Sequence, residues 1–163
     1  MVYNGIMNRE TAIKKQGEFG ERLVQKMFKE KYSLNVIKNP DEFGRWDMFV
    51  YNDDHSFART VQVKTVARYC AKNYFALHGG VTGRAIQTMI TADSLILVCR
   101  NPWGFTDYEY GGKILEVVDH EGYKVNIKGE YVIPSTPNCL TVLDELDPNV
   151  LKELDAFDTR KRR

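Results

Sequence analysis

The stretch GRWDMFVYNDDHSFARTVQVKTV, residues 44 to 66, decides the fold of this chain. Two apolar segments flank the polar run Asn52–Ser56, a pattern typical of a β-hairpin. A turn centred in this run places Asp47 directly across from Gln62, with the two Cβ atoms about 5 Å apart. Side chains alternate between the faces of a strand, so Gln62 and Lys64 point the same way. One face of the predicted hairpin therefore carries a carboxylate, an amide and an ammonium group.

This face of the predicted hairpin is suited to a divalent metal ion and an anion. Hard cations bind carboxylate and amide oxygens, and a lysine attracts an anion such as phosphate. Val61 and Val63 point to the opposite face, where we expect them to form a core together with Trp46 and Phe49. The alternative is that the polar residues are ordinary solvated side chains on an exposed sheet face.

Length and composition favour one globular domain. The chain has 163 residues, of which 43% are hydrophobic and 12% aromatic, which argues against disorder. The formal net charge is only +1, so nucleic-acid binding would need a local basic patch. We expect no membrane span and no signal peptide, because no apolar run is long enough. The three cysteines (Cys70, Cys99 and Cys139) are predicted to be buried thiols in a reducing compartment, which favours a cytoplasmic location.

A helical pattern begins at Gly17, after a polar segment whose start we expect to be an arm. Five apolar side chains share one stripe of this predicted helix: Phe19, Leu23, Val24, Met27 and Phe28. Glu21 lies at the edge of the stripe, so it can lean over the element on which the helix packs, and the hairpin is the candidate. A solvated glutamate is the alternative for Glu21.

Ser94–Cys99 is a continuous apolar run, typical of a fully buried central strand. Asp147 and Pro148 suit the N-cap and first position of a last helix. The further predicted elements are a strand at Leu34–Lys38, a helix through Ile86 to Ile90 with Thr82 as its cap, a C-terminal β-hairpin of Lys113–Val118 and Tyr123–Ile127, and a short edge strand at Tyr131–Pro134.

The predicted order of elements is a helix with Glu21, a strand, a hairpin with Asp47, Gln62 and Lys64, a second helix and a buried strand. This ordered set resembles the PD-(D/E)XK nuclease superfamily, with its restriction-endonuclease-like fold. Its members carry a glutamate in the first helix, an aspartate at the start of the second core strand and Glu/Asp/Gln-x-Lys on the third. The resemblance covers about residues 17 to 100.

Two runs carry the resemblance to particular branches of this superfamily. The run GEFGER at residues 17 to 22 is similar to Holliday-junction resolvases, and VQVKT at residues 61 to 65 is similar to group I intron homing endonucleases. Two positions depart from the common pattern: no proline precedes Asp47, and Gln62 removes one negative charge from the metal ligands.

The resemblance implies an α/β fold with a mixed central sheet flanked by helices, to which the sequence pattern adds a C-terminal β-hairpin and helix. We expect one domain over residues 1–163, with a core at about 17–100 that the resemblance covers and an extension at about 101–163. The implied activity is metal-dependent DNA endonuclease, with Mg²⁺ or Mn²⁺ held by Glu21, Asp47, Gln62 and the backbone carbonyl of Val63. Lys64 would orient the attacking water and stabilise developing charge.

DNA phosphates are the expected partners of basic residues near this site. The candidates are Arg45, Arg68, Lys72 and Arg84, and a solvated charge is the alternative for each. A homo-oligomer would suit cleavage of both strands. Sequence-specific and branched-DNA substrates both stay open, as does RNA. A different class of function is a catalytically inactive nucleic-acid-binding or inhibitory protein on the same fold.

Overall fold

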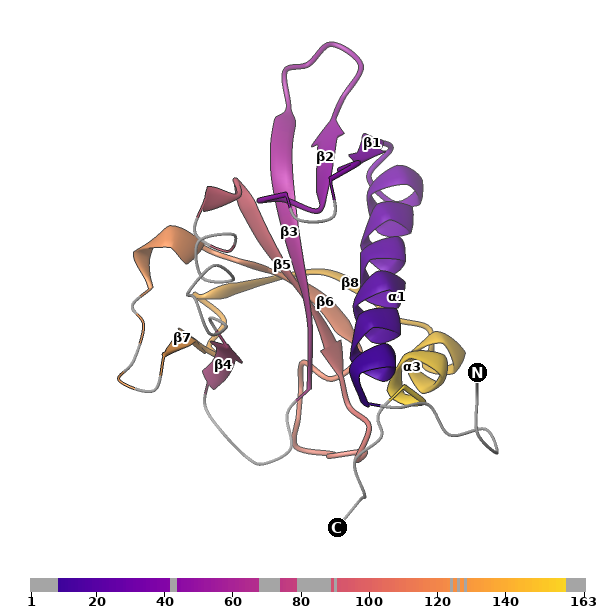
Figure 1. Cartoon of the computed structure of the whole chain (residues 1–163), viewed down its shortest axis with the longest axis vertical. Coiled ribbons are helices and arrows are strands. Elements are labelled where there is room, and N and C mark those ends of the chain that lie inside the picture. Colours follow the sequence, from indigo (N-terminus) through magenta and orange to yellow (C-terminus); the bar gives the residue numbers. More distant parts are fainter. Residues whose placement is uncertain are drawn as a thin grey trace.

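The computed structural model describes residues 9–41, 44–67, 74–78, 89, 91–123, 125, 127 and 129–157. Its α/β fold confirms the predicted class (Figure 1). In chain order the elements are α1 (Arg9–Glu30), β1 (Asn35–Lys38), β2 (Met48–Tyr51), β3 (Ala58–Ala67), β4 (Tyr74–His78), β5 (Ser94–Arg100), β6 (Lys113–Val117), the 3-10 helix η1 (His120–Gly122), β7 (Glu130–Pro134), β8 (Leu140–Glu145) and α3 (Pro148–Asp155).

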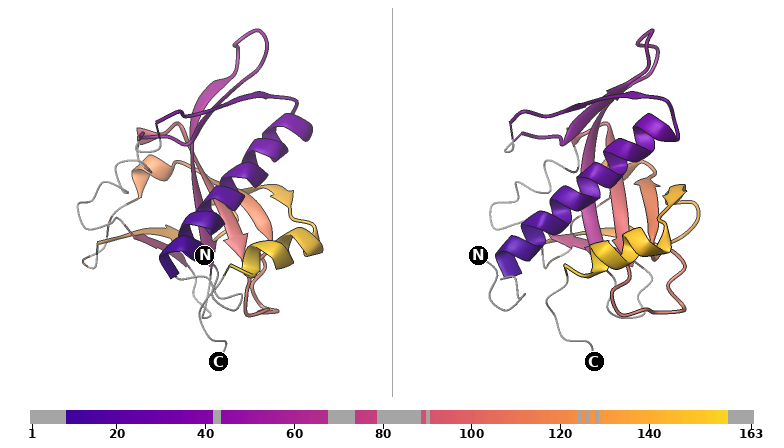
Figure 2. Two further views of the ribbon diagram at one scale, coloured as in Figure 1. Left: turned by 45° about the vertical axis from the view of Figure 1, so that its right-hand side comes forward. Right: turned by 90° about the vertical axis from the view of Figure 1, so that its right-hand side faces the viewer.

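The central sheet is mixed and has six strands in the order β1-β2-β3-β5-β6-β8. Strands β3 and β5 are parallel, and every other neighbouring pair in this sheet is antiparallel. Helix α1 runs across one face of the sheet with α3 beside it (Figure 2). Strands β4 and β7 pair antiparallel in a second, two-stranded sheet.

Strand β5 lies between two hydrophobic cores, and its burial confirms the prediction from its continuous apolar sequence. All seven of its residues are buried. Ile96 and Val98 pack in the core beneath α1 and α3. Leu95, Leu97 and Cys99 pack in the other core, which includes side chains of the small β4–β7 sheet. The two cores lie on opposite faces because successive side chains of a strand point to opposite sides.

The β2–β3 hairpin has the predicted register. Met48 pairs with Val61 and Tyr51 with Ala58, so the turn is centred between Asp54 and His55. The prediction that Trp46 and Phe49 join Val61 and Val63 in one core is wrong. The alternation of β2 directs Met48 and Val50 toward α1, whereas Trp46 and Phe49 are only half-buried and belong to neither core.

Helix α1 begins at Arg9, eight residues before the predicted start. The polar-looking first turns are helical because they also pack: Ala12 and Gln16 are buried. With its amide oriented to satisfy both groups, Gln16 accepts a hydrogen bond at 3.0 Å from Nε of Arg100, at the end of β5. A buried polar pair therefore extends the helix beyond its apolar stripe.

The C-terminal pairing also differs from the prediction. Strand β6 pairs with β8, which the sequence analysis did not predict, and within the described residues the 123–127 segment forms only a bridge from Val125 to Tyr131. The buried His120 of η1 explains the change of direction, because its Nε2 lies 2.7 Å from the carbonyl oxygen of Ala92 and ties the turn to the start of β5.

The last helix begins as predicted. The Asp147 side chain accepts a hydrogen bond from the Asn149 backbone N–H at 2.8 Å, and Pro148 occupies the first position of α3. The two described cysteines are free thiols, of which Cys99 is buried as predicted and Cys139 is only half-buried. Among the described residues, no helix combines the length and the apolar character needed to cross a membrane.

Candidate active site

Asp47 directly precedes β2 and is hydrogen-bonded to β3. Its backbone N–H donates to the Val61 carbonyl at 2.8 Å, and its Oδ2 accepts from the Val63 N–H at 2.7 Å. The side chain thus takes the place of a backbone acceptor at the end of the ladder. The carboxylate is consequently held against the β3 backbone and is largely removed from solvent.

Asn39, which the sequence analysis did not select, fixes the chain on either side of this carboxylate. Its backbone N–H donates to the Asp47 carbonyl at 2.9 Å, and its Nδ2 donates to the Trp46 carbonyl at 2.8 Å. Its Oδ1 accepts from the Asp41 N–H at 3.0 Å. The Asn-Pro-Asp sequence after β1 is a turn signal that could have indicated this role.

Helix α1 brings Glu21 to Asp47 by approaching β3 very closely. A Cβ at Gly20 would overlap Oγ1 of Thr65 on β3, so this contact requires glycine. Glu21, the next residue, forms a side-chain hydrogen bond with Asp47. Burial, followed by the charge of Asp47, raises the pKa of Glu21 from 4.5 to about 7. Glu21 therefore carries the proton of a carboxylate pair.

Two lysines interact electrostatically with the Glu21–Asp47 carboxylate pair. Burial lowers the pKa of Lys64, against the opposing effect of the Asp47 and Glu21 charges. The positive charge of Lys38 acts on both carboxyl groups and opposes the rise in their pKa values. Burial is the larger effect, so the pKa of each group stays above its ordinary value. Lys38, at the end of β1, was also missed by the sequence analysis, because its proximity depends on the pairing of β1 with β2.

Gln62 is the most enclosed polar residue of the predicted set, with 6% of its surface exposed. Its Oε1 is buried and has no hydrogen-bond partner among the described residues. Leaving a buried amide oxygen without a partner costs about 1–3 kcal/mol, so a ligand that satisfies it would be stabilised there. Val63, the next residue, donates its N–H to Asp47.

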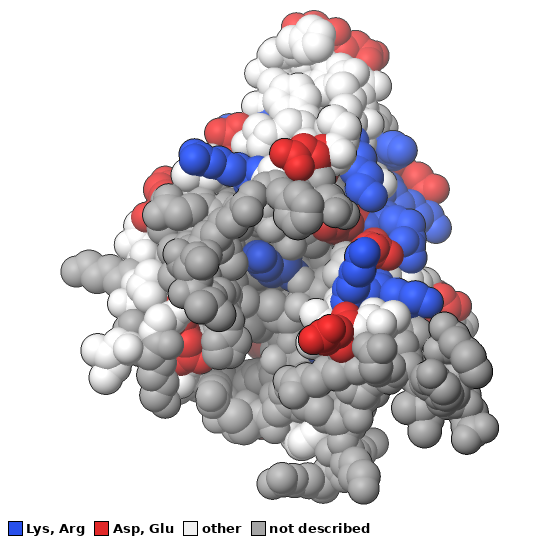
Figure 3. All heavy atoms as spheres, in the orientation of Figure 1, with Lys and Arg blue, Asp and Glu red and all other residues white. Residues whose placement is uncertain are grey.

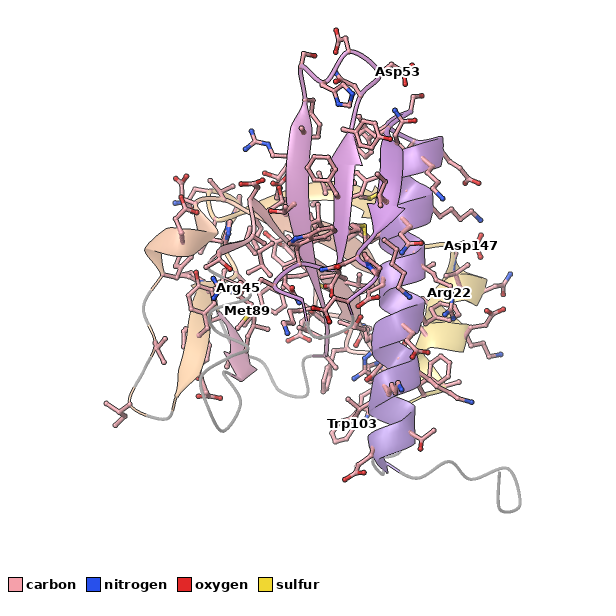
Figure 4. All side chains as sticks on the ribbon, turned by 45° about the horizontal axis from the view of Figure 1, so that its top comes forward. Arg22, Arg45, Asp53, Met89, Trp103 and Asp147 are labelled. Carbon is pink, nitrogen blue, oxygen red and sulfur yellow. The ribbon has the colours of Figure 1, made fainter. Side chains whose placement is uncertain are left out.

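The structure thus brings together Glu21, Asp47 and Lys64, with Gln62 and Val63 on the same stretch of β3. Arg45 is exposed on the loop before β2 and projects away from α1 (Figure 4). The other three predicted DNA contacts, Arg68, Lys72 and Arg84, lie outside the described residues. Lys and Arg side chains gather on the side of this face where α1 lies, and acidic side chains mark the tip of the β2–β3 hairpin (Figure 3).

The donors suit a hard divalent cation. Within the described ranges, no three His, Cys, Asp or Glu side chains form a metal-binding group by themselves. The candidate set instead combines the Glu21 and Asp47 carboxyl groups with the unpartnered oxygen of Gln62. Two carboxyl groups that share a proton can bind a cation in its place, and Mg²⁺ accepts carboxylate and amide oxygens. The oxygen donors of Glu21, Asp47 and Gln62 therefore fit a divalent cation such as Mg²⁺.

No protein-family model matches this chain, and no curated protein and no solved structure is significantly similar to it. The function must therefore be inferred from the site.

Proposed function

We propose that this protein is a divalent-metal-dependent endodeoxyribonuclease of the PD-(D/E)XK type. The observation that carries this proposal is the convergence of Glu21, Asp47 and Lys64 beside the unpartnered oxygen of Gln62. A carboxylate pair with a neighbouring lysine is the equipment that phosphodiester hydrolysis needs, because it can hold a cation and stabilise an anion.

Glu21, Asp47, Gln62 and the backbone carbonyl of Val63 would hold Mg²⁺ or Mn²⁺. Such an ion supplies a Lewis acid for the phosphoryl oxygen and lowers the pKa of a bound water. Asp47 is held in place by the Val63 N–H and by the loop that Asn39 ties, so its carboxylate is fixed before substrate arrives. This preorganisation favours the transition state over the free substrate.

Lys64 would act on the reacting phosphate through its Nζ. An ammonium group in a largely buried position stabilises negative charge more strongly than one in water. The Nζ would donate hydrogen bonds to the attacking water or to a phosphoryl oxygen. Lys38 and Arg45, both exposed, would contact neighbouring phosphates.

The order of elements supports the same proposal. Three antiparallel strands follow α1, and β5 then returns parallel to β3. The active-site residues come from α1 and from the middle of this sheet, in the order that the resemblance implies. A dimer would bring two such sites to the two strands of a duplex.

Cleavage of labelled linear duplex and four-way-junction DNA tests the proposal, with Mg²⁺, with Mn²⁺ and with EDTA. We expect metal-dependent cutting that Asp47→Asn and Lys64→Met each reduce by at least about a hundredfold, as removal of a preorganised charged group does. Glu30→Gln and Lys29→Met are matched controls on the exposed end of α1 and should cut like the wild type. The preferred substrate separates homing-type from resolvase-type activity.

The second candidate is an inactive nucleic-acid-binding protein on this fold. Gln62 favours it, because an amide in place of a carboxylate weakens the hold on a cation. Binding of DNA without cutting under any metal condition, unchanged in Asp47→Asn, would support this alternative and reject the nuclease.

A further inference from the structure

Trp46 lies directly beside the proposed catalytic carboxylate and is supported from two sides. Its carbonyl accepts the hydrogen bond from Asn39 Nδ2 at 2.8 Å, and its ring centroid lies 6.4 Å from that of Phe49 at an interplanar angle of 59°. The indole is therefore held by its backbone and by a ring neighbour, yet it remains half-buried and belongs to neither hydrophobic core.

The aromatic side chains beyond Phe49 continue as a row on the face of β2 away from α1. Phe49 and Tyr51 are 5.7 Å apart at 30°, and Tyr51 and His55 are 5.1 Å apart at 10°. Because Tyr51 lies close to parallel with His55, one face of its ring is already covered. Trp46 is the end of the row, so it has one ring neighbour within the row instead of two.

Charge distinguishes the two ends of this row. At the hairpin tip, Asp53 and Asp54 place negative charge beyond His55, and Figure 4 labels Asp53 there. At the other end, Arg45 is exposed next to Trp46. An exposed cation is therefore available to a phosphate at the Trp46 end, whereas the tip carries two carboxylates.

We propose that the Trp46 indole stacks on an unpaired base of a DNA substrate, at the nucleotide next to the phosphate that is cut. Every base has a flat face that the accessible part of an indole can cover, so this contact selects unpaired bases without reading their sequence. In an intact duplex each base is already stacked, and exposing one has a cost. The substrate class is thus DNA with unpaired bases at the cleavage position, either single-stranded or at a branch point.

The position next to the cut rests on the proposed nuclease function, but the stacking contact can be tested separately by binding in EDTA. The chain has two tryptophans, so a Trp103→Phe background leaves Trp46 as the only indole. We expect its fluorescence to be quenched by an oligothymidylate of about 20 nucleotides, which offers only unpaired bases. A blunt duplex, in which every base is paired and stacked, should not quench it.

Substitutions provide the second measurement. We expect Trp46→Leu to weaken oligothymidylate binding roughly tenfold and Trp46→Phe to restore most of it, because the ring and not the apolar surface is required. Trp103→Leu is the matched control and should bind like the wild type. Circular dichroism would verify that each variant is folded.

Two results would overturn the proposal: single-stranded DNA that binds without changing the emission of Trp46, or a Trp46→Leu variant that binds it as well as the wild type. Efficient cutting of blunt duplex by Trp46→Leu would reject the stacking role and leave the nuclease proposal standing. Single-strand binding that depends on Trp46, without metal-dependent cutting, would support the stacking role and reject the nuclease.

Discussion

The carboxylate pair shows how far single residues could be predicted. The hairpin register was readable from the symmetric apolar segments around Asn52–Ser56, so the placement of Asp47 near the Gln62–Lys64 stretch followed from the sequence. The helix stripe made the hairpin the candidate partner of Glu21, but it did not determine which hairpin residue Glu21 would meet. Asn39 acts through hydrogen bonds of a loop, and no periodicity indicates those contacts.

Substitution of Glu21 by Gln should flatten the pH dependence of stability. The pKa of Glu21 is about 7 in the folded protein, above its ordinary value of 4.5, so the unfolded state binds fewer protons between these values. Stability from this group is full below about pH 4.5 and is lost as the pH rises through 7. The neutral amide avoids this loss.

Urea unfolding in EDTA at several pH values measures the effect. At pH 8 we expect Glu21→Gln to be more stable than the wild type by about 1 kcal/mol, a value reduced for partial solvent exposure, with no difference near pH 4. Glu30→Gln, on the exposed end of the same helix, is the control. Parallel pH profiles for wild type and Glu21→Gln would contradict the shared proton.

At the scale of elements, close contact between α1 and β3 places the site. Glycines at 17 and 20 look equivalent in the run GEFGER, but only Gly20 faces a neighbour at short distance. The sequence predicted a helix and a strand here, because both have clear apolar periodicity. It did not predict that α1 begins at Arg9, since the first turns pack through the polar Gln16.

The two glycines should therefore respond in opposite directions to alanine. In Gly20→Ala the added Cβ overlaps Thr65 Oγ1, and we expect a loss of about 1–3 kcal/mol in unfolding free energy together with reduced cutting. In Gly17→Ala nothing lies within 4 Å of the added atom, so better helix propensity should stabilise the protein by about 0.5–1 kcal/mol.

A double variant separates the overlap from other effects. Gly20→Ala combined with Thr65→Ala removes the hydroxyl that the new Cβ would meet, so part of the lost stability should return. Thermal or urea unfolding of the four proteins gives the coupling energy. Strict additivity of the two substitutions would show that the helix and strand are not in contact at these residues.

At the scale of the whole molecule, two cores share one strand. The apolar run of β5 predicted a buried centre, and this was confirmed. The β4–β7 sheet was not predicted as a pair, because Phe75 pairs with Ile133, 58 residues later in the chain, and short strands carry weak signals. The β6–β8 pairing was not predicted either, because the nearer segment 123–127 was expected to pair with β6 in place of the more distant β8.

Divalent ions should stabilise the whole fold if the site binds them. For a dissociation constant of about 1 mM, about 10 mM Mg²⁺ adds roughly 1.4 kcal/mol to the unfolding free energy, a Tm rise of about 3–5 °C for a chain of this size. Asp47→Asn should lose this rise, and Glu30→Gln should keep it. An equal rise in wild type and Asp47→Asn would place the ion elsewhere.

The far edge of the central sheet carries a feature that bears on solubility. Leu143 is the extra residue where the register of β6 and β8 shifts, and its carbonyl accepts hydrogen bonds from Lys31 Nζ at 2.7 Å and Tyr32 Oη at 2.6 Å, the two residues directly after α1. A strand from another molecule that approached β8 would find this acceptor occupied and the edge irregular, conditions that discourage edge-to-edge aggregation. The residues directly after α1, the helix that carries Glu21, thus also hinder the addition of strands from other molecules to this edge of the sheet.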